Sequence, residues 1–246
     1  MRDFLAAFQF LTIIPLPGRA TSSEWNVARS MAYYPIVGSG IGLILVLARL
    51  CFALFLPHTV VAILLIIVLV LITGALHLDG FSDTMDGLRS GKSREEALRI
   101  MRDSRVGAFG AIGLGCLLVL KFALLVEIPE GILDRTLILM TTVGRWSMVQ
   151  VSYGSLYARP QGGLAKPFVE GVGKRELLIS TISLLAVAAS LLGLRGILII
   201  GLNGLLNHFI RRYFHRRLGG ITGDTLGATN EVSEVTSLLG IVALAG

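Results

Sequence analysis

Long apolar runs alternate with short polar stretches along the whole chain. A helix crosses a bilayer with roughly 20 apolar residues. Runs of about that length cover residues 36–56, 59–78, 108–127, 136–157, 177–194, 196–214 and 225–245. The last run is the weakest, because its first half is polar. The pattern predicts an all-α, polytopic membrane helix bundle with about seven transmembrane helices.

The first 35 residues contain no unbroken run of this length. The segment FLAAFQFLTIIPLP is apolar, but Pro15 and Pro17 end any helix within it. We therefore expect an N-terminal interfacial or re-entrant segment. Neither a repeat nor a change of composition divides the chain, so residues 1–246 are expected to form a single integral-membrane domain.

The composition agrees with a membrane protein. Apolar residues make up 54% of the chain and charged residues only 15%, and the mean hydropathy is +0.76. Soluble domains usually carry about a quarter charged residues. Cys51 and Cys116 both lie in apolar runs, where we expect small hydrophobic side chains rather than a disulfide.

The basic residues predict the orientation of the bundle. They gather in four places, namely Arg2, Arg19 and Arg29, then residues 89–105, 159–175 and 211–217. The connections between these groups are short and poor in basic residues. The positive-inside rule then puts the N-terminus and the basic loops in the cytoplasm, for a multi-pass protein of the inner membrane. The formal net charge of +6 fits phospholipid headgroups and requires no nucleic acid partner.

A short helix is predicted within the second basic group. Ser93 and Glu96 have the spacing of a capping box, and apolar residues follow with a helical period. An amphipathic helix on the cytoplasmic face and an ordinary solvated loop helix explain this pattern equally well.

Three aspartates directly after the second apolar run are the strongest chemical feature. In HLDGFSDTMDG, Asp79, Asp83 and Asp86 have the spacing i, i+4, i+7, which places them on one stripe of a helix. Like charges repel there, and each is costly near hydrocarbon. A divalent cation would compensate them, and Mg²⁺ bound by carboxylates and substrate phosphates is typical chemistry. The alternative is a helix end whose aspartates are simply hydrated.

A second acidic group begins the last apolar run at the same predicted boundary. It contains Asp224, Glu231 and Glu234. Glycines accompany both groups, as in Gly80 and Gly227, and leave room for a neighbouring helix or a substrate. A hydrated helix end is again the alternative, and it fits this group better than the first.

Other polar residues are candidates for substrate binding. Arg102 and Arg105 flank Asp103 and can hold a diphosphate, whereas the arginines of residues 211–217 are better explained as a topology signal. Asn203 and Asn207 are four residues apart within a run and are expected to line one cavity.

Three basic residues lie inside the apolar runs themselves. Lys121 and Arg145 are costly there unless they face the bundle interior or snorkel, and Arg49 is expected to snorkel to the membrane surface.

These residues indicate a Mg²⁺-assisted transfer between a diphosphate substrate and an acceptor at the cytoplasmic face of a membrane. Transfer from a nucleotide to an alcohol and prenyl transfer satisfy the pattern equally. A transporter or channel is a non-enzymatic alternative, but its polar residues would be spread through the bilayer rather than gathered at one interface.

The sequence resembles the cobalamin synthase family, adenosylcobinamide-GDP ribazoletransferase. The resemblance rests on HLDGFSDTMDG, MRDSRVGAFG and LGGITGDTLGATNEVSE, in that order. The segments FLAAFQFLTIIPLP and YYPIVGSGIGL are similar to the N-terminal region of the family, so the likeness covers nearly the whole chain.

The resemblance implies a Mg²⁺-dependent transferase late in adenosylcobalamin synthesis. Its substrates would be adenosylcobinamide-GDP and α-ribazole or α-ribazole 5′-phosphate, and GMP would be released. We expect Asp79, Asp83, Asp86 and Asp224 to hold the metal, Asp83, Asp86, Asp224 and Glu231 to act in catalysis, and Arg102, Arg105, Asn203 and Asn207 to bind substrate. A CDP-alcohol phosphotransferase fits less well, because its D-x-x-D-G-x-x-A-R pattern is missing here, and a prenyltransferase is a looser match.

Overall fold

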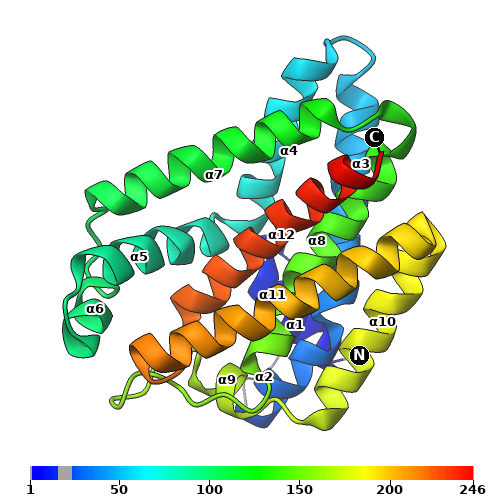
Figure 1. Cartoon of the computed structure of the whole chain (residues 1–246). Coiled ribbons are helices and arrows are strands. Elements are labelled where there is room, and N and C mark those ends of the chain that lie inside the picture. Colours follow the sequence, from blue (N-terminus) through cyan, green and yellow to red (C-terminus); the bar gives the residue numbers. More distant parts are fainter. Residues whose placement is uncertain (1, 16–23, 246) are drawn as a thin grey trace.

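The structure is a computed structural model that describes residues 2–15 and 24–245, and these residues form a bundle of helices (Figure 1). The elements are α1 (Arg2–Leu11), α2 (Glu24–Ser30), the 3₁₀ turn η1 (Met31–Tyr33), α3 (Tyr34–Phe52), α4 (His58–Thr73), α5 (Leu76–Ser90), α6 (Arg94–Ile100), α7 (Ala108–Glu127), α8 (Glu130–Ser152), α9 (Lys166–Glu170), α10 (Lys174–Leu192), α11 (Leu194–Leu218) and α12 (Gly223–Ala245). The described residues include no strand, only one isolated bridge between Tyr157 and Ile221. The predicted all-α class is confirmed.

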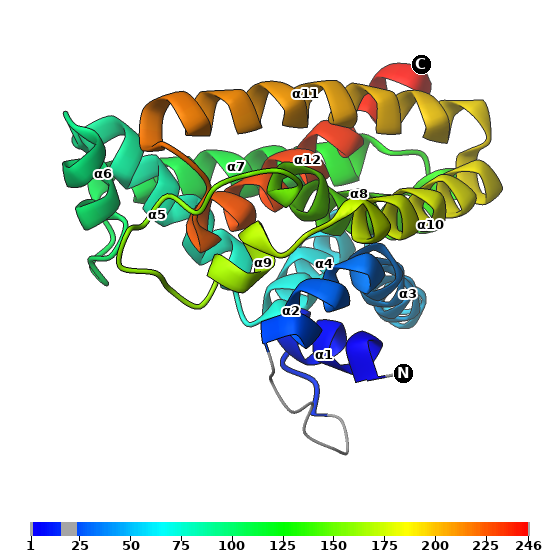
Figure 2. The same ribbon diagram turned by 90° about the horizontal axis from the view of Figure 1, so that it is seen from below.

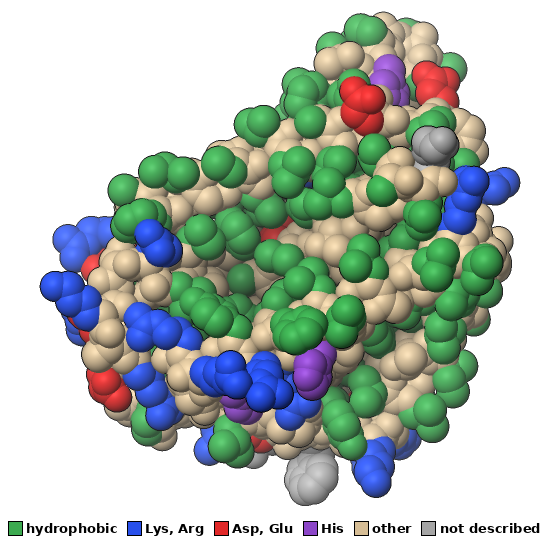
Figure 3. Space-filling view, in the orientation of Figure 1, with side chains coloured by type: hydrophobic (Ala, Val, Ile, Leu, Met, Phe, Trp, Pro, Cys, Tyr) green, Lys and Arg blue, Asp and Glu red, His purple; other side chains and the backbone are tan. Residues whose placement is uncertain are grey.

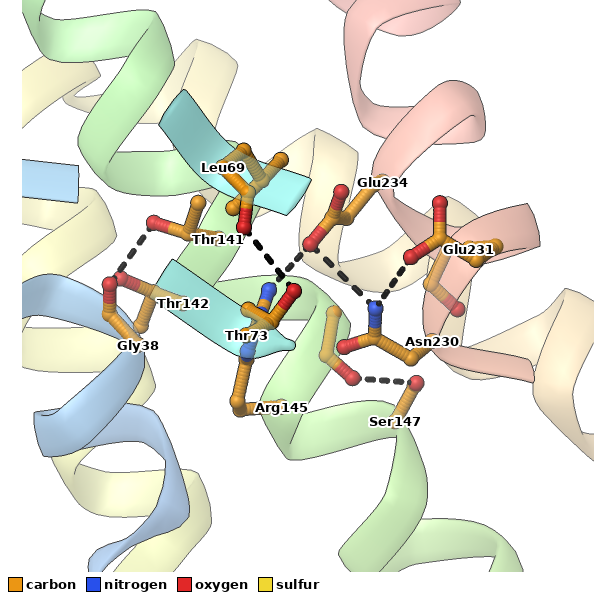
Figure 4. Close-up of polar contacts among 12 residues, drawn as sticks. Gly38, Leu69, Thr73, Thr141, Thr142, Arg145, Ser147, Asn230, Glu231 and Glu234 are labelled. Atoms are coloured by element: carbon orange, nitrogen blue, oxygen red, sulfur yellow. Dashed lines mark hydrogen bonds and ion pairs between the residues drawn. The ribbon is translucent and has the colours of Figure 1, made fainter. Parts of the chain in front are cut away.

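Helix α8 is the centre of the bundle. It packs against α3, α10, α11 and α12, and Figure 2 shows α11 on the opposite side of α8 from α3 and α1. Close approach explains the packing with α3, because a Cβ on Gly38 or Gly42 would collide with the backbone of α8. Thr141 of α8 also donates a hydrogen bond to the carbonyl of Gly38, at 2.7 Å (Figure 4).

Three helical segments of the described chain are long and apolar enough to cross a membrane. They are Val27–Phe52, Ala108–Glu127 and Lys174–Leu192, and α4 with α5 adds a fourth if this bent pair counts as one span. Helices α8, α11 and α12 occupy the other predicted runs but are less apolar. The helical membrane bundle is therefore confirmed, whereas length and composition do not confirm the predicted number of about seven spans.

The run over residues 59–78 is predicted as one transmembrane helix, but the structure divides it into two. Helix α4 ends at Thr73, α5 begins at Leu76, and the two helices differ in direction by 92°. Gly74 and Ala75 between them both have a positive φ, of 59° and 58°, which no right-handed helix contains. This sharp turn directs the aspartate-bearing α5 away from the axis of α4.

The N-terminal segment contains α1, which buries Ala7 and Leu11 and ends before Pro15. Pro17 and Arg19 lie outside the described residues. The predicted capping of α6 is confirmed, because the Ser93 hydroxyl accepts a hydrogen bond from the Glu96 N–H at 3.1 Å.

Three of the basic groups meet at one end of the bundle. Arg94, the first residue of α6, donates to the carbonyl of Ala158 at 3.0 Å, and Arg217 at the end of α11 donates to the carbonyl of Gly91. Figure 3 shows Lys and Arg side chains along this end, while hydrophobic side chains cover much of the face formed by α7, α12 and α11. The free thiols of Cys51 and Cys116 are both exposed, and the helices that carry them are among the most apolar.

Arg49, which is predicted to snorkel, has an ion-pair partner on a neighbouring helix. Its guanidinium donates two hydrogen bonds to the carboxylate of Asp134 on α8, one of them from Nη2 at 2.8 Å. A two-pronged ion pair satisfies the charge locally and links α3 to α8. This partner lies 85 residues away along the chain and was not predicted.

Candidate active site

The site is built where α5 crosses α12. A Cβ on Gly80 would lie 2.9 Å from the Cα of Asp224, and a Cβ on Gly227 would lie 3.0 Å from the carbonyl oxygen of His77. Only glycine allows the two helices to approach this closely. The predicted role of these glycines, to admit a neighbouring helix, is confirmed.

This crossing brings the two acidic groups together. Asp79, Asp83 and Asp86 all lie on α5, as predicted. Asp83 is half-buried, and its carboxylate is near enough to those of Asp79, Asp224 and Asp86 to be repelled by all three. The arrangement thus concentrates negative charge at one place between α5 and α12.

A cavity of about 440 Å³ opens beside these carboxylates. Its acidic lining residues are Asp79 and Asp224, and its basic ones are Arg102 and Arg159. The rest of the lining consists of Phe10, Tyr34, Leu76, His77, Gly80, Met148, Tyr157, Gly162, Gly163, Leu164, Ala165, Phe168, Gly223, Leu226 and Gly227. The cavity therefore combines a charged wall with an aromatic and aliphatic wall, a combination typical of ligand sites.

Arg159 is fixed next to Asp224 by the backbone. Ala158 N–H donates to the carbonyl of Ile221 at 2.9 Å, and Ile221 N–H donates to the carbonyl of Leu156, also at 2.9 Å. This pairing aligns the loop after α8 with the residues that start α12. The Arg159 Nη2 then donates to Asp224 Oδ2 at 2.5 Å, and both side chains are largely buried.

The two arginines predicted to hold phosphate have different surroundings. Arg102 lines the cavity, and its Nη2 lies 3.5 Å from the carbonyl oxygen of Gly162. Arg105 is not part of the lining. It donates two side-chain hydrogen bonds to Asp103, at 2.8 and 3.0 Å, and this guanidinium lowers the pKa of the exposed Asp103 carboxyl to about 2.

Asp86 caps a helix. Its Oδ2 accepts the N–H of Gly107 and its Oδ1 the N–H of Gly110, both at 2.8 Å. These are two of the N–H groups that the start of α7 leaves without a partner, and the helix dipole favours a negative charge there. A Cβ on either glycine would collide with the carboxylate. The structure thus gives both oxygens of Asp86 an anchoring role between α5 and α7.

Glu231 and Glu234 lie away from the cavity, in a buried network of charges (Figure 4). Lys121 Nζ donates to Glu231 Oε2 and to Glu234 Oε2, each at 2.7 Å, and Arg145 pairs with Glu234 Oε1. The amide of Asn230 donates to both glutamates at 3.2 and 3.3 Å. Lys121 and Arg145 therefore face the interior, one of the two possibilities left open by the sequence, and Glu231, which was predicted to act in catalysis, pairs with Lys121 in this network.

Asn203 and Asn207 connect helices. Asn203 donates to the hydroxyl of Ser237 at 3.2 Å, and Asn207 donates to Gln150 Oε1 at 3.0 Å and accepts from Ser233 at 3.1 Å. Both asparagines are fully buried. Neither lines the cavity at the crossing of α5 and α12, and their side chains join α11 to α12 and α8.

Sequence reasoning assigned no site role to two residues of the cavity. Arg159 was only one of many basic residues in its loop. His77 belongs to the HLDGFSDTMDG motif, is 2% exposed, and neither ring nitrogen has a hydrogen-bond partner among the described residues. Its place two residues before Asp79 was the available signal.

The acidic residues fit a metal site that a substrate completes. The described residues contain no group of three His, Cys, Asp or Glu side chains arranged to hold a metal. Asp86 is engaged by amides and Asp224 by Arg159, which leaves Asp79 and Asp83 as carboxylates without a hydrogen-bond donor among the described side chains. One or two carboxylates together with substrate phosphates are the usual ligands of Mg²⁺.

Comparison with known proteins agrees with these features. The family described as cobalamin-5-phosphate synthase matches residues 3–242. A protein of Geotalea daltonii named adenosylcobinamide-GDP ribazoletransferase is 40% identical over 246 residues, which are 100% of this chain and 99% of the relative. A protein of the same name from Acetivibrio thermocellus is 35% identical over 239 residues, 97% and 96% of the two chains. No solved structure matches. From its motifs, its helical membrane fold and this match over almost its whole length, the chain belongs to the cobalamin-5-phosphate synthase family.

Proposed function

We propose that this protein is a Mg²⁺-dependent adenosylcobinamide-GDP ribazoletransferase that joins adenosylcobinamide phosphate to α-ribazole or α-ribazole 5′-phosphate. The observation that carries the proposal is the cavity at the crossing of α5 and α12, where carboxylates and arginines line one wall. Relatives that match the full chain have the name of this activity.

The reaction requires one bond to form and one to break. A ribose hydroxyl of the acceptor attacks the corrinoid-side phosphorus of the diphosphate, and the bond from that phosphorus to the oxygen of GMP breaks. The hydroxyl loses its proton, and GMP leaves with the electron pair of the broken bond. Transfers of this kind depend mainly on positioning and on stabilising the charge of the transferring group.

The residues of the cavity have distinct roles in this proposal. Asp79 in the lining and Asp83 one helical turn along α5 would hold Mg²⁺ together with the diphosphate, and the ion would supply positive charge to the phosphoryl oxygens. Arg102 and Arg159 contact the phosphates, and Asp224 keeps the Arg159 guanidinium in place through their 2.5 Å hydrogen bond. We assign no direct role to Arg105, Glu231, Asn203 or Asn207, because each has a partner outside the cavity.

The apolar wall of the cavity suits the heterocyclic base of the acceptor, the end opposite its reacting ribose hydroxyl. Phe10, Tyr34 and Phe168 lie together, with the rings of Phe10 and Phe168 4.4 Å apart. Aromatic rings of this kind stack on planar heterocycles, and the base of α-ribazole is one. We also infer that the end of the bundle where three basic groups gather faces the cytoplasm.

The test is the complete reaction with purified protein in detergent or nanodiscs. Mg²⁺, adenosylcobinamide-GDP and α-ribazole should yield GMP and one corrinoid product in equal amounts. No GMP should form when α-ribazole is omitted. Release of GMP at the same rate without α-ribazole would indicate a hydrolase and contradict the proposal, as would the absence of GMP altogether. Rates with α-ribazole and with its 5′-phosphate identify the preferred acceptor.

A further inference from the structure

A second cavity, of about 360 Å³, adjoins the first between α6 and residues 159–161. We call it the arginine pocket. It is lined by Arg94, Glu95, Leu98, Arg99, Arg102, Arg159, Pro160 and Gln161, and it shares Arg102 and Arg159 with the first cavity. Four arginines and one glutamate give it a strong positive charge, and its volume is within the range of small-molecule sites, about 300–1,000 Å³.

Three of the four arginines have partners in the protein, and the lining also offers charged groups that have none. Arg94 donates to the carbonyl of Ala158, Arg102 donates to that of Gly162 at 3.5 Å, and Arg159 pairs with Asp224. The side chains of Arg99 and Glu95 are exposed and form no hydrogen bond or ion pair with any residue that the structure describes. A concave surface with an unpaired guanidinium and an unpaired carboxylate is suited to a polar ligand that is mainly anionic.

We propose that the arginine pocket binds the guanosine monophosphate half of adenosylcobinamide-GDP. This inference rests on the proposed function. With the reacting phosphorus beside Asp79 in the first cavity, as proposed above, a diphosphate that passes Arg102 and Arg159 carries its nucleotide end into the second cavity. Arg99 then pairs with the phosphate of the leaving GMP, as a two-pronged donor.

Glu95 adds selectivity for the base. The Watson–Crick edge of guanine presents two donors, N1–H and the 2-amino group, whereas adenine presents one donor and one acceptor at that edge. An ionised carboxylate only accepts hydrogen bonds, so it pairs with guanine at both positions and with adenine at one. A carboxylate also makes the pocket less suited to an anionic lipid headgroup, the other source of phosphate at a membrane surface.

Arg99 is the residue to change, because it lines the arginine pocket but not the first cavity. In Arg99→Gln we expect the KM for adenosylcobinamide-GDP and the inhibition constant of GMP to rise together, each about tenfold, the effect of one charge-assisted hydrogen bond. The kcat and the KM for α-ribazole should change little, since the contact is remote from the reacting phosphorus. Arg175→Gln removes an equally exposed arginine outside the pocket and should leave all four constants unchanged.

Nucleotide selectivity tests Glu95. The wild-type protein should be inhibited more strongly by GMP than by AMP, and Glu95→Gln should reduce that preference by about tenfold, mainly through weaker GMP binding. Unchanged GMP inhibition in both Arg99→Gln and Glu95→Gln, in a protein that still makes the corrinoid product, would overturn the inference and leave the proposed function intact.

The lipid alternative needs its own measurement. GMP inhibition is repeated in nanodiscs of phosphatidylcholine and of phosphatidylcholine with phosphatidylglycerol, and Arg99→Gln should weaken it equally in both. If Arg99→Gln changes only the response to phosphatidylglycerol and not the inhibition by GMP, the pocket holds a lipid headgroup and the inference is wrong.

Discussion

The molecule contains two groups of charges, one at the crossing of α5 and α12 and one in the buried network further along α12. They differ in whether their negative charges have positively charged partners. In the buried network, Glu231 and Glu234 have Lys121, Arg145 and Asn230 as partners. At the cavity, Asp79 in the lining and Asp83 one helical turn along α5 have no such partners and lie close to further carboxylates. Charges that compensate one another hold helices together, whereas uncompensated charges beside a cavity need a ligand.

The largest effect is expected from Asp83→Asn, which removes a charge from the uncompensated group. The amide keeps the shape of the side chain but is a much weaker metal ligand. Losing about 4 kcal/mol of stabilisation would slow the transfer roughly a thousandfold, as measured by GMP release. Thermal stability without Mg²⁺ should stay level or rise, because repulsion with Asp79 and Asp224 is relieved. Near-normal turnover in this variant would remove Asp83 from the metal site.

Glu234→Gln should instead lower stability more than it lowers activity. It leaves Arg145 and one bond of Lys121 without a negative partner inside the bundle, which costs about 3–5 kcal/mol in comparable buried pairs. We expect a marked drop in the midpoint of thermal unfolding. Protein that stays folded at low temperature should keep its KM for α-ribazole. A variant with wild-type stability and lost turnover would place Glu234 in the chemistry instead.

Asp86→Asn distinguishes the two roles proposed for the aspartates on α5, which are anchoring the start of α7 and binding Mg²⁺. The variant loses a charge-assisted hydrogen bond to the start of α7, and an amide nitrogen now faces one N–H donor. Stability should fall by about 1–3 kcal/mol, while the response to added Mg²⁺ should persist. Equilibrium unfolding with and without Mg²⁺ tests both parts. If Asp86→Asn abolishes the Mg²⁺ response without loss of stability, Asp86 is a metal ligand.

The smallest effect is expected from Arg102→Lys, which preserves the charge but removes the two-pronged geometry. The kcat/KM for adenosylcobinamide-GDP should fall about tenfold, a loss of about 1.4 kcal/mol. Arg105→Lys is the matched comparison in the same loop, since Arg105 is paired with Asp103 outside the cavity. An equal loss of kcat/KM in the two variants would contradict a specific role of Arg102 in binding the phosphates.

The features that sequence reasoning predicted well are local ones. The stripe of Asp79, Asp83 and Asp86 follows from helical periodicity, and the capping of α6 from the spacing of Ser93 and Glu96. A charge exposed to lipid is costly, so Lys121 and Arg145 had to face the interior or snorkel, and both are buried in the bundle.

The features that it missed depend on distant partners. Glu231 and Lys121 are 110 residues apart, and Arg159 and Asp224 are 65 apart. A glutamate at the start of an apolar run looks the same whether it meets a metal or a lysine, so the pairing of Glu231 with Lys121 could not be predicted. The bend at Ala75 was missed for a related reason, since a positive φ in alanine is imposed by its surroundings.

The most direct test of the uncompensated site is the change in thermal stability of the resting protein on adding Mg²⁺ and GMP. Ligands that bind the folded state stabilise it, by about 2.7 kcal/mol at a hundred times the dissociation constant. The account predicts that the wild type and Glu231→Gln are both stabilised by Mg²⁺ with GMP, whatever their starting midpoints, and that Asp83→Asn is stabilised much less. An equal shift in Asp83→Asn and the wild type would contradict it.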